Sequence, residues 1–349
     1  MRIGVLTGGG DCPGLNAVIR AVVIAGAQLH ADETVGYLDG WRGVMERRSV
    51  KLRPQRVQDL LTRGGTVLGS SRTNPFVTDE GPRAAVDTLR EDGIDALVAI
   101  GGDDTLGVAH RLGPLGPKVV GVPKTIDNDL SGTDVTFGFH TAVETATEAI
   151  DRLQTTAESH HRVIVCEVMG RHVGWIAAYS GIAGGADAIL VPEVPFDVAE
   201  VCERITLRHR RGRYSSVVVV SEGALPAPGP DLDSAKAATT SGNVDQFGHA
   251  QLGGIGAWLA TEIERRTGYE SRHTTLGHIQ RGGSPTAYDR VLATRFGVEA
   301  VAAVHDGTFD KMVALQAGRI VRVPLEEAVG QPKSLDLELL TQVAAPFVT

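Results

Sequence analysis

Residues 121–129 read Gly-Val-Pro-Lys-Thr-Ile-Asp-Asn-Asp, and residues 101–105 read Gly-Gly-Asp-Asp-Thr. Each stretch follows a short apolar run that is typical of a buried strand. Together they place aspartates, a lysine and a glycine pair in one part of the chain. Carboxylates can hold a divalent metal or accept a proton, lysine can bind an anion, and glycines let a ligand approach the backbone. These groups are the working parts of phosphoryl transfer, although either stretch alone is also typical of an acidic surface turn.

The order of apolar run, glycine turn and helical periodicity recurs along the chain. Strands are expected at 2–7, 95–100, 118–122, 162–168, 186–191, 215–220 and 272–276, and helices at 16–30, 105–112, 139–158, 251–267 and 288–304. This alternation predicts an α/β protein of two Rossmann-like lobes with largely parallel sheets. Ligands of such sheets bind at the carboxyl ends of the strands, where the motifs of this chain fall.

The lobes are expected at residues 1–138 plus about 285–335, and at 139–284 plus the C-terminal tail. Residues 224–250 are rich in Pro, Gly, Ala, Ser and Thr and lack strong periodicity. They are interpreted as a long surface excursion, either a lid or an inert insertion.

Composition excludes several classes of protein. Of 349 residues, 42% are hydrophobic and 22% charged, which is ordinary for a soluble chain long enough for two lobes. The 43 glycines cluster at the ends of apolar runs and indicate many tight turns. A formal net charge of −8 argues against a general nucleic-acid binder, which needs a basic face.

The cysteines and the apolar runs indicate the compartment. Cys12, Cys166 and Cys202 have neither metal-ligand nor CxxC spacing. The chain opens directly into a strand, and no apolar stretch is long enough to span a bilayer. We therefore expect a cytoplasmic protein that binds neither membranes nor nucleic acid.

The turn Gly8–Gly10 lies between a strand and a helix, with Asp11 and Gly14 beside it. Its backbone N–H groups, at the positive end of the helix, could hold a phosphate. The turn matches no P-loop, and a structural tight turn is nearly as good an interpretation. Arg72, in a Gly-Ser-Ser-Arg loop, could stabilise a transferring group nearby.

The two acidic stretches contain the candidate catalytic groups. Asp103 could hold Mg²⁺ against substrate phosphates, or cap the helix that follows. Asp104 adds a second negative charge that should restrict the size of a polyphosphate donor. Asp127 is the candidate general base for a hydroxyl nucleophile, while Thr125 could donate to the moving phosphoryl group. Lys124 could neutralise charge on the donor, and Asp129 could tune the base or form an Asx turn.

Four arginines at strand edges or in glycine-flanked loops suggest a pocket for a sugar phosphate: Arg162, Arg171, Arg272 and Arg281. His278 lies beside the last of them. Glu222 ends an apolar strand, where it could accept hydrogen bonds from sugar hydroxyls or form a buried ion pair.

Four motifs occur in an order that resembles the 6-phosphofructokinase family: 101–103, 123–129, Glu-Val-Met-Gly-Arg at 167–171 and Leu-Gly-His-Ile-Gln-Arg-Gly-Gly-Ser-Pro at 276–285. The resemblance extends over nearly the whole chain. It implies two lobes with the active site between them and phosphorylation of fructose 6-phosphate at its 1-hydroxyl. It further implies that Asp127 is the proton acceptor and Asp103 the Mg²⁺ ligand.

The resemblance also assigns binding residues. It implies donor contacts at Gly9, Gly10, Arg72, Asp104, Thr105 and Lys124. It implies sugar-phosphate contacts at Thr125, Ile126, Asp127, Met169, Gly170, Arg171, Glu222, His278 and Arg281. Arg162 and Arg272 match arginines that reach a neighbouring subunit's site, which implies a homodimer or homotetramer.

Asp104 and Lys124 together match the pyrophosphate-dependent members of that family. ATP-dependent members usually carry glycine in place of Asp104 and often in place of Lys124. An aspartate there should crowd the α-phosphate of ATP, so pyrophosphate is the expected donor. The alternatives are an ATP-dependent 6-phosphofructokinase and a non-catalytic sugar-phosphate sensor. A dinucleotide-dependent oxidoreductase is more distant, because the first glycine turn lacks a convincing ribose-binding acid.

Bacterial ATP-dependent members bind effectors at an arginine-rich site between subunits. Arg20, Arg53 and Arg213 match that site, but Ile24 and Gln154 stand where arginines are expected. Two charge-assisted contacts, each worth roughly 1.5–3 kcal/mol, are therefore missing. We expect little regulation of this kind.

Overall fold

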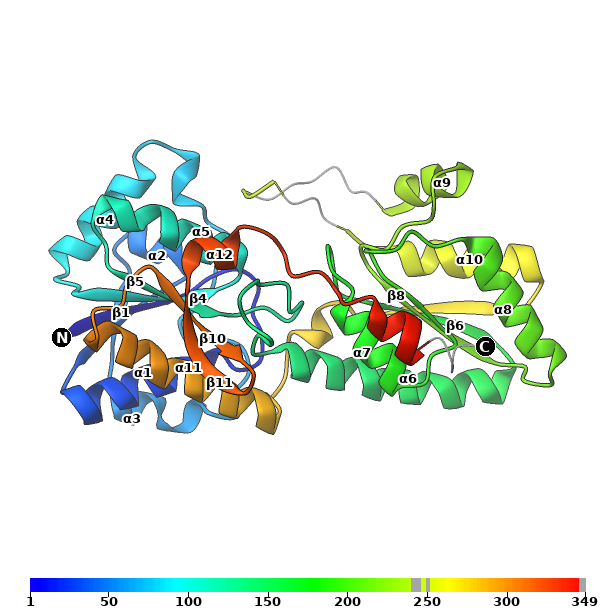
Figure 1. Cartoon of the computed structure of the whole chain (residues 1–349), viewed down its shortest axis with the longest axis horizontal. Helices are drawn as coiled ribbons and strands as arrows, with labels where there is room; N and C mark the ends of the chain where they lie inside the picture. The colour runs from blue at the N-terminus through cyan, green and yellow to red at the C-terminus, as the bar shows by residue number, and fades with distance from the viewer. Residues whose placement is uncertain (240–245, 249–251, 345–349) are drawn as a thin grey trace. The chain divides into compact units, whose positions relative to one another are not determined.

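The computed structural model describes residues 1–239, 246–248 and 252–344 of the chain. The chain forms two compact units. Unit 1 comprises Met1–Thr141, Asp245–His249 and Arg281–Pro332, and unit 2 comprises Ala142–Val244, Ala250–Gln280 and Lys333–Thr349. Each unit contains one sheet flanked by helices (Figure 1).

The sheet of unit 1 has seven strands in the order β11-β10-β5-β4-β1-β2-β3. Its pairings are parallel from β10 through β5, β4 and β1 to β2, and the two outermost pairings, β2–β3 and β10–β11, are antiparallel. The strands are β1 (Arg2–Thr7), β2 (Glu33–Tyr37), β3 (Ser49–Leu52), β4 (Ala96–Gly101), β5 (Val119–Pro123), β10 (Lys311–Gln316) and β11 (Arg319–Pro324).

Helices cover both faces of this sheet, which explains why β4 and β5 are continuous apolar runs buried along their whole length. Figure 1 shows α1, α3 and α11 on one side and α2, α4, α5 and α12 on the other. Their bounds are α1 (Leu15–His30), α2 (Trp41–Met45), α3 (Pro54–Val57), α4 (Gly81–Glu91), α5 (Asp103–Leu112), α11 (Ala287–His305) and α12 (Leu325–Val329).

Unit 2 has a four-stranded parallel sheet in the order β7-β8-β6-β9. Its strands are β6 (Val163–Val168), β7 (Ala188–Leu190), β8 (Ser216–Ser221) and β9 (Ser271–Thr275). Helices α6 and α7 lie on one face and α8 and α10 on the other (Figure 1). The helices are α6 (Phe139–His160), whose first residues belong to unit 1, α7 (Trp175–Ala183), α8 (Val198–Arg210), α9 (Pro230–Thr239) and α10 (Ile255–Thr267).

The predicted α/β class with largely parallel sheets is confirmed, and each predicted strand is present with bounds shifted by at most two residues. No element was predicted for residues 31–94 or for the β10–β11 hairpin, and α9 within 224–250 was not predicted either. This helix has little amphipathic pattern, but Ala235 and Thr239 are buried and Ser234 Oγ accepts a hydrogen bond of 3.0 Å from Trp258 Nε1. The rest of the predicted excursion includes 240–245 and 249–250, which lie outside the described residues.

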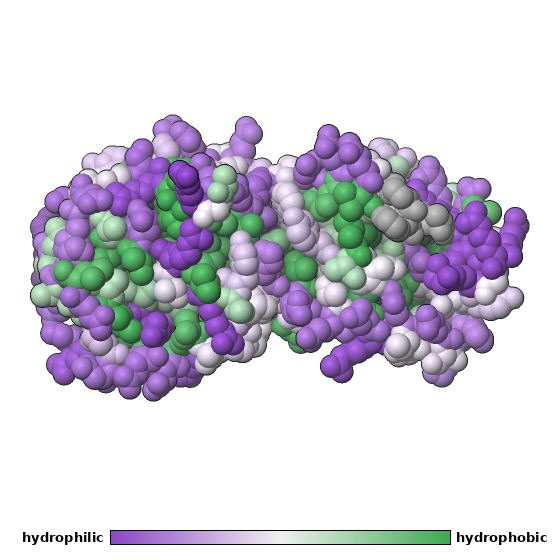
Figure 2. All heavy atoms as spheres, turned by 60° about the horizontal axis from the view of Figure 1, so that its bottom comes forward, coloured by the Kyte–Doolittle hydropathy of each residue, from purple (hydrophilic) through white to green (hydrophobic). Residues whose placement is uncertain are grey.

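Polar residues cover most of the face that Figure 2 shows, and hydrophobic residues form separate patches. Among the described residues, no helix is both long and apolar enough to cross a membrane.

Candidate functional site

Three neighbouring parallel strands of unit 1 deliver the predicted motifs to one edge of the sheet. Strand β4 pairs with β1 on one side and β5 on the other, with Thr7 opposite Ile100 and Gly101 opposite Pro123. The carboxyl ends of these strands therefore lie side by side. They carry the glycine turn (residues 8–10), the Gly-Gly-Asp-Asp segment and the loop 124–129.

Thr105 fills the space between the first two of these segments. A Cβ built on Gly8 would lie 2.4 Å from Thr105 Oγ1, and one on Gly101 would lie 2.3 Å from Thr105 Cβ. Both glycines are thus required for this close approach. Thr105 is only 3% exposed, so its main observed role is packing.

The glycine turn uses part of its own hydrogen-bonding capacity inside the fold. Gly8 N donates to Ile100 O at 3.0 Å, and Gly9 N donates to Ser71 O at 3.1 Å. Ser70 Oγ donates to Gly9 O. Two N–H groups of the expected phosphate cradle are therefore already engaged. The same bonds bring the loop that carries Arg72 to the turn.

Lys124 lies behind the glycine turn rather than in open solvent. Its side chain is 5% exposed, and its Nζ donates a 2.6 Å hydrogen bond to Gly10 O. Burial lowers the pKa of Lys124, and the like charge of Arg281 lowers this pKa as well, whereas Asp129 and Asp127 raise it. The ammonium is held at the turn at an electrostatic cost that an anion would reduce.

Arg281 also lies against the turn. A Cβ built on Gly10 would lie 1.4 Å from Arg281 Nη1 and 2.7 Å from its Cζ. The guanidinium therefore occupies the space that a side chain at residue 10 would need. Arg281 was predicted to bind the sugar phosphate, and its contact with the glycine turn was not predicted.

The loop after β5 holds its acidic residues through local hydrogen bonds. Thr125 Oγ1 accepts from Asp127 N at 3.1 Å, which leaves its hydroxyl proton available for donation. Asn128 has a φ of 55° and accepts from Thr136 N at 3.1 Å, while Thr136 Oγ1 donates to Thr125 O at 2.8 Å. Residue 136 thus fixes the backbone around Asp127 and Ile126.

Asp103 and Asp104 occupy the first turn of α5, with Gly102 at the N-cap position. Asp103 is exposed and Asp104 partly buried. Within the described ranges, no group of three or more His, Cys, Asp or Glu side chains could hold a metal ion. Mg²⁺ is commonly bound by one or two carboxylates together with substrate phosphates and water, so an exposed Asp103 at a strand end fits that ion.

Unit 2 presents a second set of predicted residues at the ends of β6 and β8. Gly170 has a φ of 133°, and a Cβ there would lie 2.4 Å from Ser221 Oγ, which donates to Gly170 O at 2.7 Å. A Cβ on Gly223 would lie 1.9 Å from Arg171 O. The two glycines let the 169–171 segment pass directly beside Glu222.

The segment that carries His278 is attached to the same place. Gln280 is fully buried; its Oε1 accepts from Met169 N at 3.4 Å and its Nε2 donates to Gly277 O at 3.1 Å. His278 is exposed in this short 3₁₀ turn. Sequence reasoning missed Gln280 and Ser221, although Gln280 lies inside one quoted motif.

Arg162 and Arg272 meet at one carboxylate, that of Glu270. Arg162 Nη2 lies 2.7 Å from Glu270 Oε1, and Arg272 also pairs with this oxygen. The two predicted inter-subunit arginines are therefore neighbours in unit 2. Of the predicted residues, unit 1 holds Arg72, Arg281 and those of the three strand ends, and unit 2 holds Arg162, Met169, Gly170, Arg171, Glu222, Arg272 and His278.

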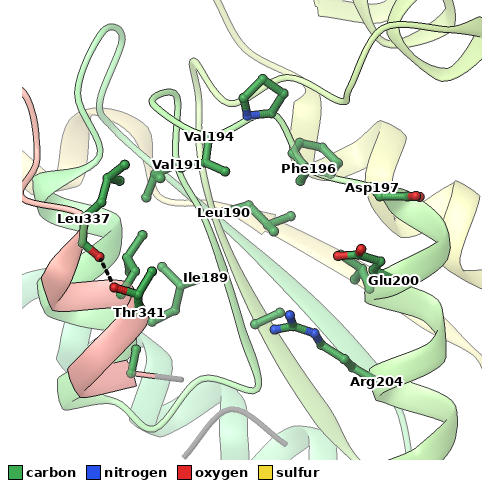
Figure 3. A pocket seen from close by; sticks show the side chains of 15 residues that line it. Ile189, Leu190, Val191, Val194, Phe196, Asp197, Glu200, Arg204, Leu337 and Thr341 are labelled. Carbon is green, nitrogen blue, oxygen red and sulfur yellow. Dashed lines mark hydrogen bonds between the residues drawn. The ribbon is translucent and has the colours of Figure 1, made fainter. Parts of the chain in front are cut away.

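Unit 2 also contains an apolar pocket of about 300 Å³. Figure 3 shows Leu190, Phe196 and Val194 around it, with Asp197 at the N-cap of α8, Glu200 and Arg204 on that helix, and Leu337 and Thr341 opposite. Its lining contains no residue of the four motifs.

The chain is similar to known phosphofructokinases over most of its length. The family model described as phosphofructokinase matches residues 2–304. A pyrophosphate–fructose 6-phosphate 1-phosphotransferase of Streptomyces coelicolor is 57% identical over 348 residues, which cover 99% of this chain and 100% of the relative. ATP-dependent 6-phosphofructokinase 2 of the same organism is 53% identical over 347 residues, with coverage of 99% and 100%.

A solved structure of phosphofructokinase from Pichia pastoris in the T-state matches with 34% identity and a TM-score of 0.82. The match covers 99% of this chain and 36% of the Pichia chain, so this chain spans about a third of that protein's length. With the family model matching 303 of its residues, from 2 to 304, and relatives matching nearly its whole length, the chain belongs to the phosphofructokinase family.

Proposed function

We propose that the chain transfers a phosphoryl group from pyrophosphate to the 1-hydroxyl of fructose 6-phosphate, giving fructose 1,6-bisphosphate and phosphate. The observation that carries the choice of donor is Asp104, which stands beside Asp103 at the start of α5. A second carboxylate repels and crowds the further phosphate of a nucleotide, while a two-phosphate donor fits. The name of the 57% identical relative supports the same reaction.

Asp127 acts as the base in this proposal. The 1-hydroxyl oxygen of the sugar forms a bond to phosphorus, its proton passes to the Asp127 carboxylate, and the bridging P–O bond of pyrophosphate breaks to release phosphate. Thr125 donates its hydroxyl proton to the transferring group. The 3.1 Å bond from Asp127 N to Thr125 Oγ1 supports this pairing of roles. Because an anhydride and a sugar ester differ modestly in energy, the reaction is reversible and serves glycolysis or gluconeogenesis.

Asp103 is the residue that would hold Mg²⁺. The ion, when bound with the donor, neutralises phosphate charge. Lys124, Arg72 and the glycine turn supply further positive groups on the same side, so unit 1, predicted at 1–138 plus about 285–335, is proposed as the donor lobe.

Unit 2 is proposed as the main sugar-phosphate lobe. Glu222 accepts hydrogen bonds from sugar hydroxyls, and Met169–Arg171 and His278 line the same site. Arg162 and Arg272 are proposed to reach the site of a neighbouring subunit in a dimer or tetramer. Both arginines pair with Glu270 of their own chain, so a phosphate bound by them would have to compete with this carboxylate.

The effector site of bacterial ATP-dependent enzymes is proposed to be inactive. Gln154, where an arginine is expected, donates its amide Nε2 to Gly184 O and Gly185 O and so serves the fold. Adding ADP or phosphoenolpyruvate at subsaturating substrate should therefore leave the rate unchanged.

The donor is tested by initial rates with pyrophosphate and with ATP on the purified protein, since a 53% identical relative is ATP-dependent. The expected result is activity with pyrophosphate and little with ATP. Asp104→Gly should gain ATP use and lose pyrophosphate use, while Asp79→Gly in an exposed turn should do neither. A wild-type protein active with ATP alone would refute the proposal.

Catalysis itself is tested with Asp127→Ser. A general base should account for on the order of 10²- to 10⁴-fold in turnover. A variant as active as the wild type would exclude Asp127 as the base. A wild-type protein that binds fructose 6-phosphate but transfers no phosphoryl group would instead be a sensor.

A further inference from the structure

The contact between Arg281 and the glycine turn carries an inference about the donor. Two cations converge on one residue of the turn: Lys124 Nζ lies 2.6 Å from Gly10 O, and Arg281 lies over the Gly10 Cα, where a Cβ would be 1.4 Å from Nη1. Both side chains belong to unit 1.

Two backbone N–H groups of the turn are not available to bind an anion, so an anion there would be bound mainly by these two side chains. The N–H groups of Gly8 and Gly9 already donate to Ile100 O and Ser71 O. Lys124 is 95% buried, since its exposed fraction is 5%. Burial and the like charge of Arg281 lower the pKa of Lys124, whereas the carboxylates of Asp129 and Asp127 raise it, and an anionic donor between the two cations would add to that favourable interaction.

Gly10 makes this arrangement possible because it has no side chain. Nη1, Cζ and Nη2 of Arg281 lie 1.4, 2.7 and 3.3 Å from the position a Cβ would take. An alanine at residue 10 would require Nη1 and Cζ of Arg281, which are the far end of a flexible side chain, to move away from the turn. Gly9 differs, because its nearest contact would be Lys124 Nζ at 3.3 Å.

We propose that Arg281 binds the pyrophosphate donor at the glycine turn and that Gly10 positions its guanidinium there. Arg281 is then a donor residue in addition to any contact with the sugar phosphate. This inference rests on the proposed pyrophosphate-dependent function. It predicts that Gly10 and Arg281 act as a pair.

The test is a double-mutant cycle of Gly10→Ala and Arg281→Ala, read out as KM for pyrophosphate, KM for fructose 6-phosphate and calorimetric binding of pyrophosphate without sugar. Gly10→Ala should weaken pyrophosphate binding about ten- to hundredfold, the range for one charge-assisted hydrogen bond. In the Arg281→Ala background it should weaken binding by no more than about twofold, because nothing is left to displace. Gly107→Ala is the matched control, since a Cβ there meets no atom within 4 Å.

Three outcomes would overturn the inference. Gly10→Ala could leave pyrophosphate binding unchanged, it could act equally strongly without Arg281, or Arg281→Ala could raise only the KM for fructose 6-phosphate. Arg281→Lys, which keeps the charge, gives a further variant if alanine impairs folding. Failure of the proposed function is separate, since it would already show as a wild type without pyrophosphate activity.

Discussion

At the scale of single residues, Gly170 is a position that no other residue can fill without loss. Its φ of 133° is in the region that favours glycine, and a Cβ would meet Ser221 Oγ at 2.4 Å and Val173 O at 2.6 Å. Gly170→Ala should raise the KM for fructose 6-phosphate more than the KM for pyrophosphate, because the displaced segment holds Met169 and Arg171. Gly212→Ala is the control that separates a steric clash from backbone strain. Gly212 also has a positive φ, 83°, but a Cβ there would meet no atom within 4 Å. If both variants change the KM for fructose 6-phosphate equally, the contact of a Cβ at residue 170 with Ser221 and Val173 is not the cause.

Asp289 gives the protein a predictable pH response. It is fully buried in α11, and its Oδ2 accepts from Thr141 N at 2.8 Å and from Thr141 Oγ1 at 2.6 Å. Burial raises its pKa above the ordinary 3.8, although hydrogen bonds from Thr141 and Gly138 oppose this.

A raised carboxyl pKa means that the folded state holds the proton more tightly than the unfolded state. The contribution of Asp289 to the free energy of unfolding is therefore fully present below the pKa that its carboxyl has in the unfolded state. This contribution is lost as pH rises through the pKa of the folded state. The Asp289→Asn side chain cannot titrate, so the variant does not lose this stability. As pH rises from 4 to values above the folded pKa of Asp289, the free energy of unfolding of the variant should increase relative to that of the wild type. Urea unfolding at several pH values measures this, and parallel pH profiles would contradict it.

The sequence identified candidate residues but not their surroundings. Asp103, Asp127 and Arg171 could be named because they follow strand-like runs and occur in motifs whose order resembles one family, although each residue alone is also typical of a turn, a helix cap or a charged surface. The burial of Lys124 and the position of Arg281 on Gly10 could not, because both depend on segments more than a hundred residues apart meeting in space.

At the scale of elements, Glu167 joins strand β6 to helix α10. It is 1% exposed, and its Oε2 accepts from Gly256 N at 2.8 Å, with Gly254 N at 3.3 Å. A carboxylate thus satisfies the first N–H groups of α10, where the helix dipole favours negative charge.

Glu167→Gln should lower the free energy of unfolding by about 1–3 kcal/mol, since it removes a charged acceptor from buried donors. Urea unfolding measures the change, and hydrogen exchange should show faster opening of the first turn of α10. Glu203→Gln, exposed on α8, is the control. If both variants are equally stable, Glu167 does not cap the helix as described.

The elements predicted best are those with the strongest pattern. Strands β1, β4 and β5 are apolar runs that end at glycine or proline, so both the type and the ends of these elements could be predicted. Helix α9 was missed because its Ala, Thr and Ser residues show no apolar stripe. Strand β3 was not assigned because it is an edge strand with a mixed pattern, as the half-exposed Ser49–Leu52 shows. Strand β2 is an interior strand but is only five residues long and contains Gly36, so its apolar run is short.

At the scale of the whole molecule, shared sites can be tested with hybrids. If Arg162 and Arg272 complete a neighbour's site, a mixed dimer of an Asp127→Ser chain and an Arg162→Ser/Arg272→Ser chain has one fully intact site. Random mixing of two inactive variants should then restore about a quarter of wild-type activity, because half of the dimers are hybrids. Coexpressed chains with different tags allow the hybrid to be purified. Activity no greater than the sum of the parents would mean that each chain builds its own site.

The Thr105 side chain packs against Gly8 and Gly101, so it links the turn after β1 with the segment from the end of β4 to α5. Alanine at residue 8 would meet Oγ1 and Cγ2 of Thr105 and becomes tolerable only once residue 105 has been shortened, whereas alanine at residue 101 would still meet the Cβ of any residue other than glycine at 105. In evolution, a smaller residue at position 105 must therefore come before a larger residue at position 8. The volume of the Thr105 side chain sets the order of these substitutions.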